Sequence, residues 1–224
     1  MTDQEFRQQL SDKMGQEFGT VFNSIRNDLI WLTFKLSEYE VLFLKESRVQ
    51  LFNDAAPFFA YIIQKTLWEN TILSVARLID PKESGKKKTV SLRAIPEFIL
   101  NDNYKINIEN QLNLIIEAGK FAKDLRNRII AHRDYDLIVN NQKASPLLDS
   151  NLQLVKRFLS LTDVFMNEIE SKYLGTKTFY VPNRVGRGAL SLLYKIESGL
   201  RFEKLEKEMI LKGDYALNDF NSKI

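Results

Sequence analysis

The stretch "FFAYIIQKTLWENTILSVARLID", residues 58–80, is the part of the sequence that most strongly indicates the fold. Its apolar residues recur around nearly the whole circumference of a helix. This pattern predicts a helix that other helices enclose, such as the central helix of a bundle. We expect the helix to end at Asp80, because Pro81 follows and the residue before a proline avoids the helical conformation.

Helical patterning continues on both sides of this segment. The sequence "TDQE" at 2–5 has the spacing of a capping box, which predicts a helix start there. Apolar residues at spacings of three and four predict helix through residue 43, with Gly15 and Gly19 as candidate breaks and a turn at 53–57. The further predicted helices span residues 91–100, 107–134, 145–175 and about 186–212, with a charged surface loop at 81–89 and a short β-prone stretch at 176–183.

The composition agrees with an all-α fold. The chain has only nine glycines and five prolines in 224 residues, too few to punctuate a β-sandwich or a barrel, and its 44% hydrophobic content suits a globular core. We therefore predict an antiparallel helical bundle joined by short loops. Residues 1–175 should form the bundle, and residues 176–224 should form a C-terminal helical extension.

Several classes of site are excluded by residue counts. The chain has no cysteine and one histidine, so disulfides, thiolate metal sites, a cysteine nucleophile and a histidine-rich zinc site within one chain are ruled out. The acidic residues form no obvious ligand cluster. We expect no metal and no cofactor. The formal charge of +3 neither indicates nor excludes a nucleic-acid partner.

The sequence also predicts where the protein works. The N-terminus mixes acidic and basic residues and does not resemble a signal peptide. The longest apolar run, residues 55–63, is far shorter than the ~20 residues that span a bilayer. We expect a cytoplasmic protein without membrane association.

The stretch "KDLRNRIIAHRDYD", residues 123–136, contains the single histidine, His132. One interpretation is structural, because basic side chains near a helix C-terminus complement the helix dipole. The other starts from RNA chemistry. Cleavage without metal needs a base, an acid and cations beside the phosphate. Histidine can perform either proton transfer, and Arg126 can bind a phosphate through two donors while Asn127 positions an oxygen.

Helix geometry limits what one copy of this stretch can do. On an α-helix, Arg126 and His132 lie ~120° apart in azimuth and ~9 Å apart along the axis. Arg128 shares a face with His132 better, at a spacing of four residues. A second copy of the helix across a two-fold axis would close the gap and supply a second histidine. Acid–base catalysis by two histidines therefore requires a dimer.

This stretch resembles a known family. "RNRIIAHRD" at 126–134 matches the Arg-x(4–6)-His motif of the HEPN superfamily, with the polar Asn127 directly after the arginine. It ends a long helix of an all-helical chain, and "SVARLID" at 74–80 precedes it, followed by a loop and "TVSLRAI". The arrangement resembles the abortive-infection U-type subgroup of HEPN proteins over residues 55–135.

The resemblance implies a fold and an activity. It implies a four-helix bundle that dimerises so that two motifs face each other, and a metal-independent endoribonuclease in phage defence or a toxin–antitoxin system. Arg126 and His132 would be the catalytic pair and Asn127 the supporting polar residue. Arg133 and Asp134 lie in the matching stretch and would support the site. In such a dimer, Arg128 and Arg133 would also line the cleft between the two copies and bind RNA.

The resemblance also implies partners. RNA is the expected substrate, and an antitoxin or regulatory protein is a further partner class. Some HEPN toxins carry His-x-Tyr, in which a partner nucleotidyltransferase modifies the tyrosine. Here Tyr135 lies one place later, so that regulation does not carry over directly.

Several other residues are secondary candidates for a role in the site. Arg77 and Asp80, three residues apart, can pair with each other on one helix face, or can orient the motif on the neighbouring helix. Glu69, beside Trp68, is a further carboxylate that could meet Arg126. Three segments have both a structural and a binding interpretation: the aromatics of 58–63 as core or dimer interface, "NRVGRG" at 183–188 as helix entry or anion site, and "KKK" at 86–88 as solvated loop or RNA contact.

Two other functional classes remain open. A catalytically inactive HEPN-like bundle would bind RNA, a nucleotide or a protein partner without chemistry. A purely structural interaction module would need none of the motif side chains. The oligomeric state separates the enzyme from both, because each chain supplies one histidine.

Overall fold

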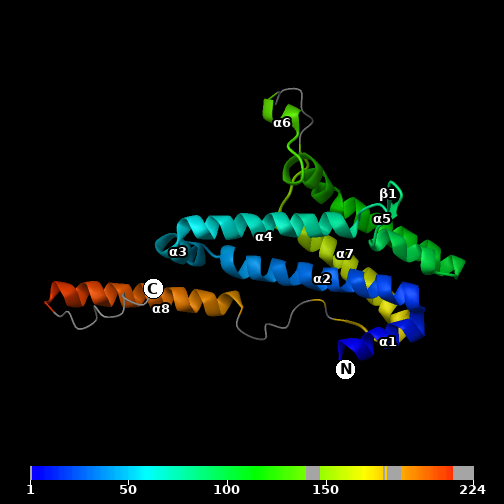
Figure 1. Cartoon of the computed structure of the whole chain (residues 1–224), viewed down its shortest axis with the longest axis horizontal. Coiled ribbons are helices and arrows are strands. Elements are labelled where there is room, and N and C mark those ends of the chain that lie inside the picture. The colour runs from blue at the N-terminus through cyan, green and yellow to red at the C-terminus, as the bar shows by residue number, and fades with distance from the viewer. Residues whose placement is uncertain (1, 140–146, 179, 181–187, 214–224) are drawn as a thin grey trace. The chain divides into compact units, whose positions relative to one another are not determined.

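The computed structural model describes residues 2–139, 147–178, 180 and 188–213. Apart from loops and one small hairpin, these residues are helical (Figure 1), so the predicted all-α bundle class is confirmed. The elements are α1 (Asp3–Met14), α2 (Gln16–Phe43), α3 (Glu46–Ala55), α4 (Pro57–Leu78), strands β1 (Glu83–Ser84) and β2 (Lys87–Lys88), the 3₁₀ helix η1 (Leu92–Phe98), α5 (Asp102–Leu125), the π-helical turn η2 (Arg126–Ile130), α6 (Tyr135–Val139), α7 (Leu152–Leu174) and α8 (Ala189–Leu211).

The chain packs as two units. Unit 1 comprises Met1–Leu36 and Trp68–Pro182, and unit 2 comprises Ser37–Leu67 and Asn183–Ile224. Helices α2 and α4 each contribute one part to either unit. The expected domain boundary at residue 175 stays a prediction.

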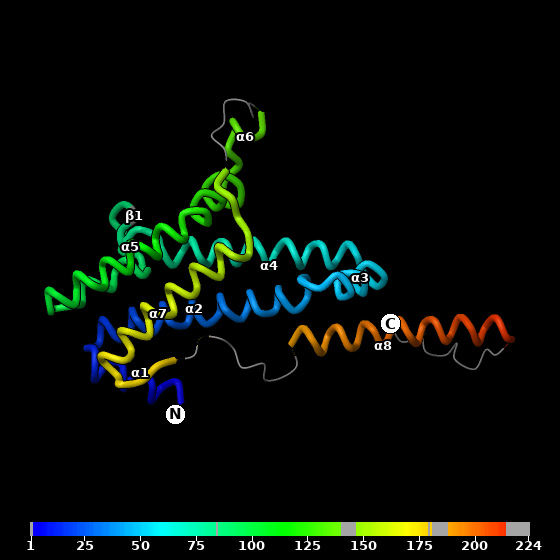
Figure 2. Tube along the Cα trace, turned by 180° about the vertical axis from the view of Figure 1, so that it is seen from behind, coloured from blue at the N-terminus to red at the C-terminus, as the bar shows by residue number. Residues whose placement is uncertain are grey.

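Unit 1 contains the larger hydrophobic core. Within it, α2 and α4 run alongside each other in opposite directions, and α5 packs against α7 (Figure 2). Helices α2, α5 and α7 each bury an apolar stripe, and the second half of α4 is buried on most sides. A fully buried aliphatic or aromatic side chain contributes ~1.5–3 kcal/mol. The largest fully buried side chains include Phe22, Ile25, Leu29, Leu32, Ile72, Leu78, Ile79, Phe158 and Phe165.

The start of the chain follows its sequence signals closely. The predicted capping box is present: Thr2 accepts from the backbone N–H of Glu5 and the Glu5 side chain accepts from Thr2. Gly15 ends α1 with a φ of 83°. The second candidate break, Gly19, lies inside α2. A Cβ there would stand 2.9 Å from backbone atoms of Leu10, so this glycine lets α1 and α2 approach closely.

The prediction that α4 is enclosed along its length is wrong for its first half. Residues of the second half, such as Val75 and Ala76, are fully buried, but Phe58 is 77% exposed and Phe59 and Tyr61 are also exposed. The apolar pattern shows that the helix is hydrophobic on all sides, but it does not show whether other helices cover every side. The break before α4 is shorter than expected, a single residue, Ala56.

The segment between α4 and α5 fixes the end of α4. The loop 81–89 contains the β1–β2 hairpin, with Glu83 opposite Lys88. The predicted helix at 91–100 is a short 3₁₀ helix. Ser91 donates from Oγ to the carbonyl of Asp80 at 2.7 Å, and Arg93 donates from Nε to the carbonyl of Ile79 at 2.9 Å. These contacts satisfy the carbonyls of the two residues that follow α4 and hold the 3₁₀ helix against that point of the chain.

Helix α5 is the element that carries the motif. Asn101 caps its start by accepting from the N–H of Tyr104. Gly119 lets α5 approach its neighbours, because a Cβ there would lie 2.8 Å from Cδ1 of Ile79 and 3.2 Å from Phe158. Helix α5 buries Leu112, Ile115 and Phe121, but Ile129 is 45% exposed, so the hydrophobic face ends before the motif does.

The partner of α5 ends as expected. Helix α7 begins after the N-cap Asn151, later than the predicted start at 145, and is closed by Gly175 in the left-handed conformation with a φ of 68°. Left-handed glycine is a common helix terminator.

Unit 2 has its own small core. Val41, Leu42, Phe52, Ala60 and Leu193 are buried there. Helix α8 lies within the predicted span, and its first N–H, that of Ala189, donates to Oε2 of Glu38 at 2.6 Å. Half of the β-prone stretch 176–183 and all but the last residue of "NRVGRG" lie outside the described residues.

Candidate functional site

The motif begins where the α-helical geometry of α5 changes. The N–H of Ala131 donates to the carbonyl of Arg126 at 2.8 Å, a five-residue spacing that defines a π-helical turn. The N–H of Asp134 then donates to the carbonyl of Arg128 at 3.0 Å. The wider turn means that the azimuth expected between Arg126 and His132 for an α-helix does not apply. Single π-turns of this kind are frequent at functional sites.

Arg126 is held by the end of α4. Its Nη1 donates to both carboxylate oxygens of Asp80, at 2.6 and 2.8 Å, and its Nε donates to Oδ1 of Asn127 at 3.1 Å. The two charged side chains are 23% and 25% exposed. Because hydrogen bonds between charged groups are strong and directional, the guanidinium has a defined orientation.

His132 and Arg133 differ from Arg126 in being exposed. Within the part of the chain that the structure describes, neither side chain has a hydrogen-bond or ion-pair partner. Asn127 is also exposed, and its carbonyl oxygen supports Arg126. Three of the predicted site residues therefore face solvent at one end of α5, and Arg126 lies half-buried beside them.

Arg128 and Asp134 form a clamp around the segment that carries His132. Arg128 donates from Nε to Oδ2 of Asp134 at 3.0 Å and also pairs with Asp124 at 3.6 Å. Oδ1 of Asp134 accepts from the backbone N–H groups of Asp136 and Leu137 in the first turn of α6. The hydrogen bond from Arg128 lowers the pKa of Asp134 most, and these N–H groups lower it further.

Arg77 and Asp80 each contact another element. Arg77 donates to Oδ1 of Asp28 on α2 at 2.8 Å, and Asp80 binds Arg126. This geometry corresponds to the interpretation in which Asp80 orients the motif. Asp80 is therefore the carboxylate that pairs with Arg126, the role for which Glu69 was the other candidate.

A pocket with a volume of about 510 Å³ lies beside Arg126. It is entirely within unit 1 and is lined by Arg77, Asp80 and Arg126 together with residues of α2 that the sequence analysis did not select: Asp28, Trp31 and Lys35. These three are spaced by three and four residues and so share one helix face. That spacing, with a tryptophan between two charges, was the available signal.

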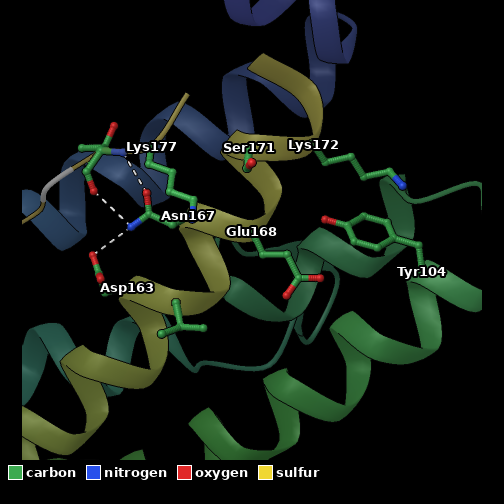
Figure 3. Close-up of a pocket in the computed structure, with 9 residues that line it drawn as sticks. Tyr104, Asp163, Asn167, Glu168, Ser171, Lys172 and Lys177 are labelled. Atoms are coloured by element: carbon green, nitrogen blue, oxygen red, sulfur yellow. Dashed lines mark hydrogen bonds between the residues drawn. The ribbon is translucent and has the colours of Figure 1, made fainter. Parts of the chain in front are cut away.

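A larger pocket, of about 690 Å³, lies near the start of α5 and contains no predicted site residue (Figure 3). There the side chain of Asn167 donates to Asp163 and to the carbonyl of Thr178, and accepts from the N–H of Thr178. Burial raises the pKa of Asp163, and Glu170 adds to this. The pocket stands at the opposite end of α5 from the motif.

Two properties apply to the described part of the chain as a whole. It contains no group of three or more histidine, cysteine, aspartate or glutamate side chains that could hold a metal ion. None of its helices combines the length and the apolar character that crossing a bilayer requires.

Comparison with known proteins gives one match. A family model for the AbiU2 type of HEPN domain matches residues 15–183. No curated protein and no solved structure matches the chain. The matched range contains Asp80, Arg126 and His132, and it covers well over half of the 224 residues. The chain therefore belongs to the AbiU2 family of HEPN domains.

Proposed function

We propose that this protein is a metal-independent endoribonuclease of the HEPN type, with a site formed across a homodimer, that acts in phage defence or a toxin–antitoxin system. One observation carries the proposal. Asp80 holds the half-buried Arg126 in a defined orientation, and the exposed His132 follows in the same stretch after α5 in an AbiU2 HEPN domain.

The proposed reaction uses the RNA's own 2′-hydroxyl as nucleophile. A base removes the 2′-hydroxyl proton while the 2′-oxygen attacks phosphorus and the bond from phosphorus to the 5′-oxygen breaks. An acid protonates the departing 5′-oxygen. The products carry a 2′,3′-cyclic phosphate and a 5′-hydroxyl. Arg126 would stabilise the charge that develops on the non-bridging phosphate oxygens.

The dimer follows from residue counting. The reaction needs one group that accepts a proton and one that donates it, and imidazole performs both near neutral pH. Each chain supplies a single histidine. His132 and the partner's His132 would then serve as base and acid in one site on a two-fold axis.

The decisive experiment is incubation with total RNA and with tRNA in excess EDTA, wild type beside His132→Ala and a surface control, Lys120→Ala. We expect cleavage by the wild type and the control, 2′,3′-cyclic phosphate ends, and no cleavage by His132→Ala. Cleavage that requires Mg²⁺ and leaves 5′-phosphates would overturn the mechanism.

The second candidate function is RNA or nucleotide binding without chemistry. It is favoured by the pairing of Arg126 with both oxygens of Asp80, which gives this arginine a structural role that requires no chemistry. Under this alternative the protein binds RNA in EDTA but produces no new ends, and His132→Ala leaves binding unchanged.

A further inference from the structure

The pocket beside Arg126 contains an exposed aromatic side chain. Trp31, on α2, is 64% exposed, and the ring of Phe34 lies 6.1 Å from it between centroids. Phe34 is 42% exposed, so the two rings form a small exposed apolar patch, and such patches, unlike single exposed residues, often mark binding surfaces. Nucleic-acid bases stack on such rings without regard to sequence, because every base has a π-face.

The pocket also contains a cation that has no carboxylate hydrogen-bond partner among the described residues. Nζ of Lys35 donates to Oδ1 of Asn70 at 2.7 Å and to Oγ of Ser74 at 2.5 Å, both uncharged oxygens. A lysine has three donors, so one remains for a ligand after these two bonds. Burial lowers the pKa of Lys35, the charge of Arg77 lowers it further, and Asp28 raises it. An anion near Nζ would offset both of the effects that lower this pKa.

The charges of the pocket favour an anion. Its two carboxylates are committed, Asp28 to Arg77 and Asp80 to Arg126. Lys35 is the third cation of the lining, which leaves one positive charge in excess. Arginine and lysine around one small volume are the usual environment of a phosphate.

We propose that this pocket is a subsite for one nucleotide of the RNA substrate, with its phosphate on Lys35 and Arg77 and its base against Trp31. The subsite adjoins Arg126 and so would hold a nucleotide next to the bond that is cut. It deepens the proposed ribonuclease function and rests on it for the identity of the ligand as RNA.

Binding can be measured apart from cleavage. The His132→Ala, Trp68→Phe double variant removes the proposed proton-transfer group and leaves Trp31 as the single tryptophan. Titration with a short single-stranded RNA should quench Trp31 fluorescence. Adenosine 5′-monophosphate should quench it at higher concentration, and inorganic phosphate should not, because it has no base to stack.

Two substitutions and matched controls test the two contacts. Binding is followed here by a fluorophore on the RNA, because Trp31 itself is changed. Trp31→Ala should weaken binding about fivefold or more, whereas Tyr194→Ala, an exposed aromatic of α8, should not. Lys35→Gln should weaken binding and flatten the salt slope by about 0.7, whereas Lys120→Gln on the surface of α5 should change neither by as much.

The outcomes separate the subsite from the proposed function. If Trp31→Ala and Lys35→Gln match their controls while the wild type cuts RNA, the subsite is overturned and the ribonuclease stands. If both weaken RNA binding but the wild type never cuts RNA, the subsite stands and the catalytic proposal fails. Binding of a phosphopeptide with the same dependence on Trp31, and no binding of RNA, would overturn the assignment of the ligand.

Discussion

At the scale of single residues, Asp80 determines what Arg126 can do. The carboxylate has two consequences: it orients the guanidinium and it offsets part of its charge. Orientation favours catalysis, whereas charge compensation weakens electrostatic attraction for a phosphate. Asp80 is therefore a positioning residue whose removal should separate RNA binding from turnover.

The substitution Asp80→Asn tests this separation. It removes the negative charge and leaves one acceptor for Arg126. We expect kcat to fall about tenfold or more, since a misplaced group near the reacting atoms can cost 10²-fold, while RNA binding stays equal or tightens. Stability should fall by at most about 1 kcal/mol because the pair is partly exposed. Cleavage kinetics and RNA titration measure both effects.

Asp28→Asn is the matched control for that experiment. It removes the same charge from the same pocket but from the pair with Arg77, not with Arg126. RNA binding should respond as in Asp80→Asn, and kcat should not. Equal loss of kcat in both variants would contradict a specific role for Asp80.

The Arg128–Asp134 clamp predicts a pH dependence of the segment around His132. The hydrogen bond from Arg128 lowers the pKa of Asp134 below its ordinary 3.8 in the folded protein. A carboxylate with a lowered folded pKa stabilises the structure above its unfolded pKa, and this stability is lost as the pH falls through the folded pKa. We expect the turn to persist at pH 5 and to open below about pH 4.

Amide hydrogen exchange at Asp136 and Leu137 measures this opening, because both N–H groups donate to Asp134. In Asp134→Asn the acid-dependent step should disappear and exchange should be faster at neutral pH. Protection that does not change between pH 5 and pH 3 in the wild type would show that Asp134 does not hold the turn.

At the scale of elements, the sequence predicts where helices form better than it predicts how they pack against one another. The capping box, Gly15 and Gly175 are local signals, and each lies where the pattern placed it. The π-helical turn has no such signal, because it depends on how the segment after α5 is held by Arg128 and Asp134. Which half of α4 is covered depends on partners far away in sequence.

The candidate site likewise combines residues that sequence spacing can select with contacts that depend on the fold. The residues of the motif share one short stretch and could be selected by spacing. The contact between Asp80 and Arg126 joins positions 46 residues apart and needs the segment just after α4 to lie against α5. Lys35 and Trp31 lie on α2, and their place beside Arg126 is a property of the fold and not of any local pattern.

The packing of α5 on the end of α4 can be tested at Gly119. In Gly119→Ala the new Cβ would meet Cδ1 of Ile79, the residue before Asp80. Overpacking of this kind costs ~1–3 kcal/mol. The higher helix propensity of alanine offsets ~0.5–1 kcal/mol of this cost. We therefore expect a smaller net loss in urea unfolding, and a fall in RNA cleavage through displacement of Asp80.

Gly199→Ala in α8 is the control for Gly119→Ala. No atom lies within 4 Å of a Cβ at position 199, so only helix propensity acts there. Stability should rise by ~0.5–1 kcal/mol with cleavage unchanged. If both glycine variants gained stability, the close approach of α5 to α4 would not constrain the fold.

At the scale of the whole molecule, one histidine per chain links catalysis to association. If His132 and the partner's His132 act together, one substituted chain should inactivate the whole dimer. If each chain contained a complete site, a substituted chain would inactivate only itself. The two cases differ in how activity depends on the fraction of wild-type chains.

Mixing wild type and His132→Ala after subunit exchange distinguishes the two cases. In an equal mixture, random pairing makes about a quarter of the dimers wild type on both sides, so we expect about a quarter of the activity in the shared-site case and about half if the sites are independent. Mixing with Lys120→Ala, an exposed change on α5, should leave activity unchanged. A protein that sediments as a monomer at micromolar concentration and still cuts RNA in EDTA would contradict the two-histidine mechanism, because one imidazole would then need a different group to complete the proton transfers.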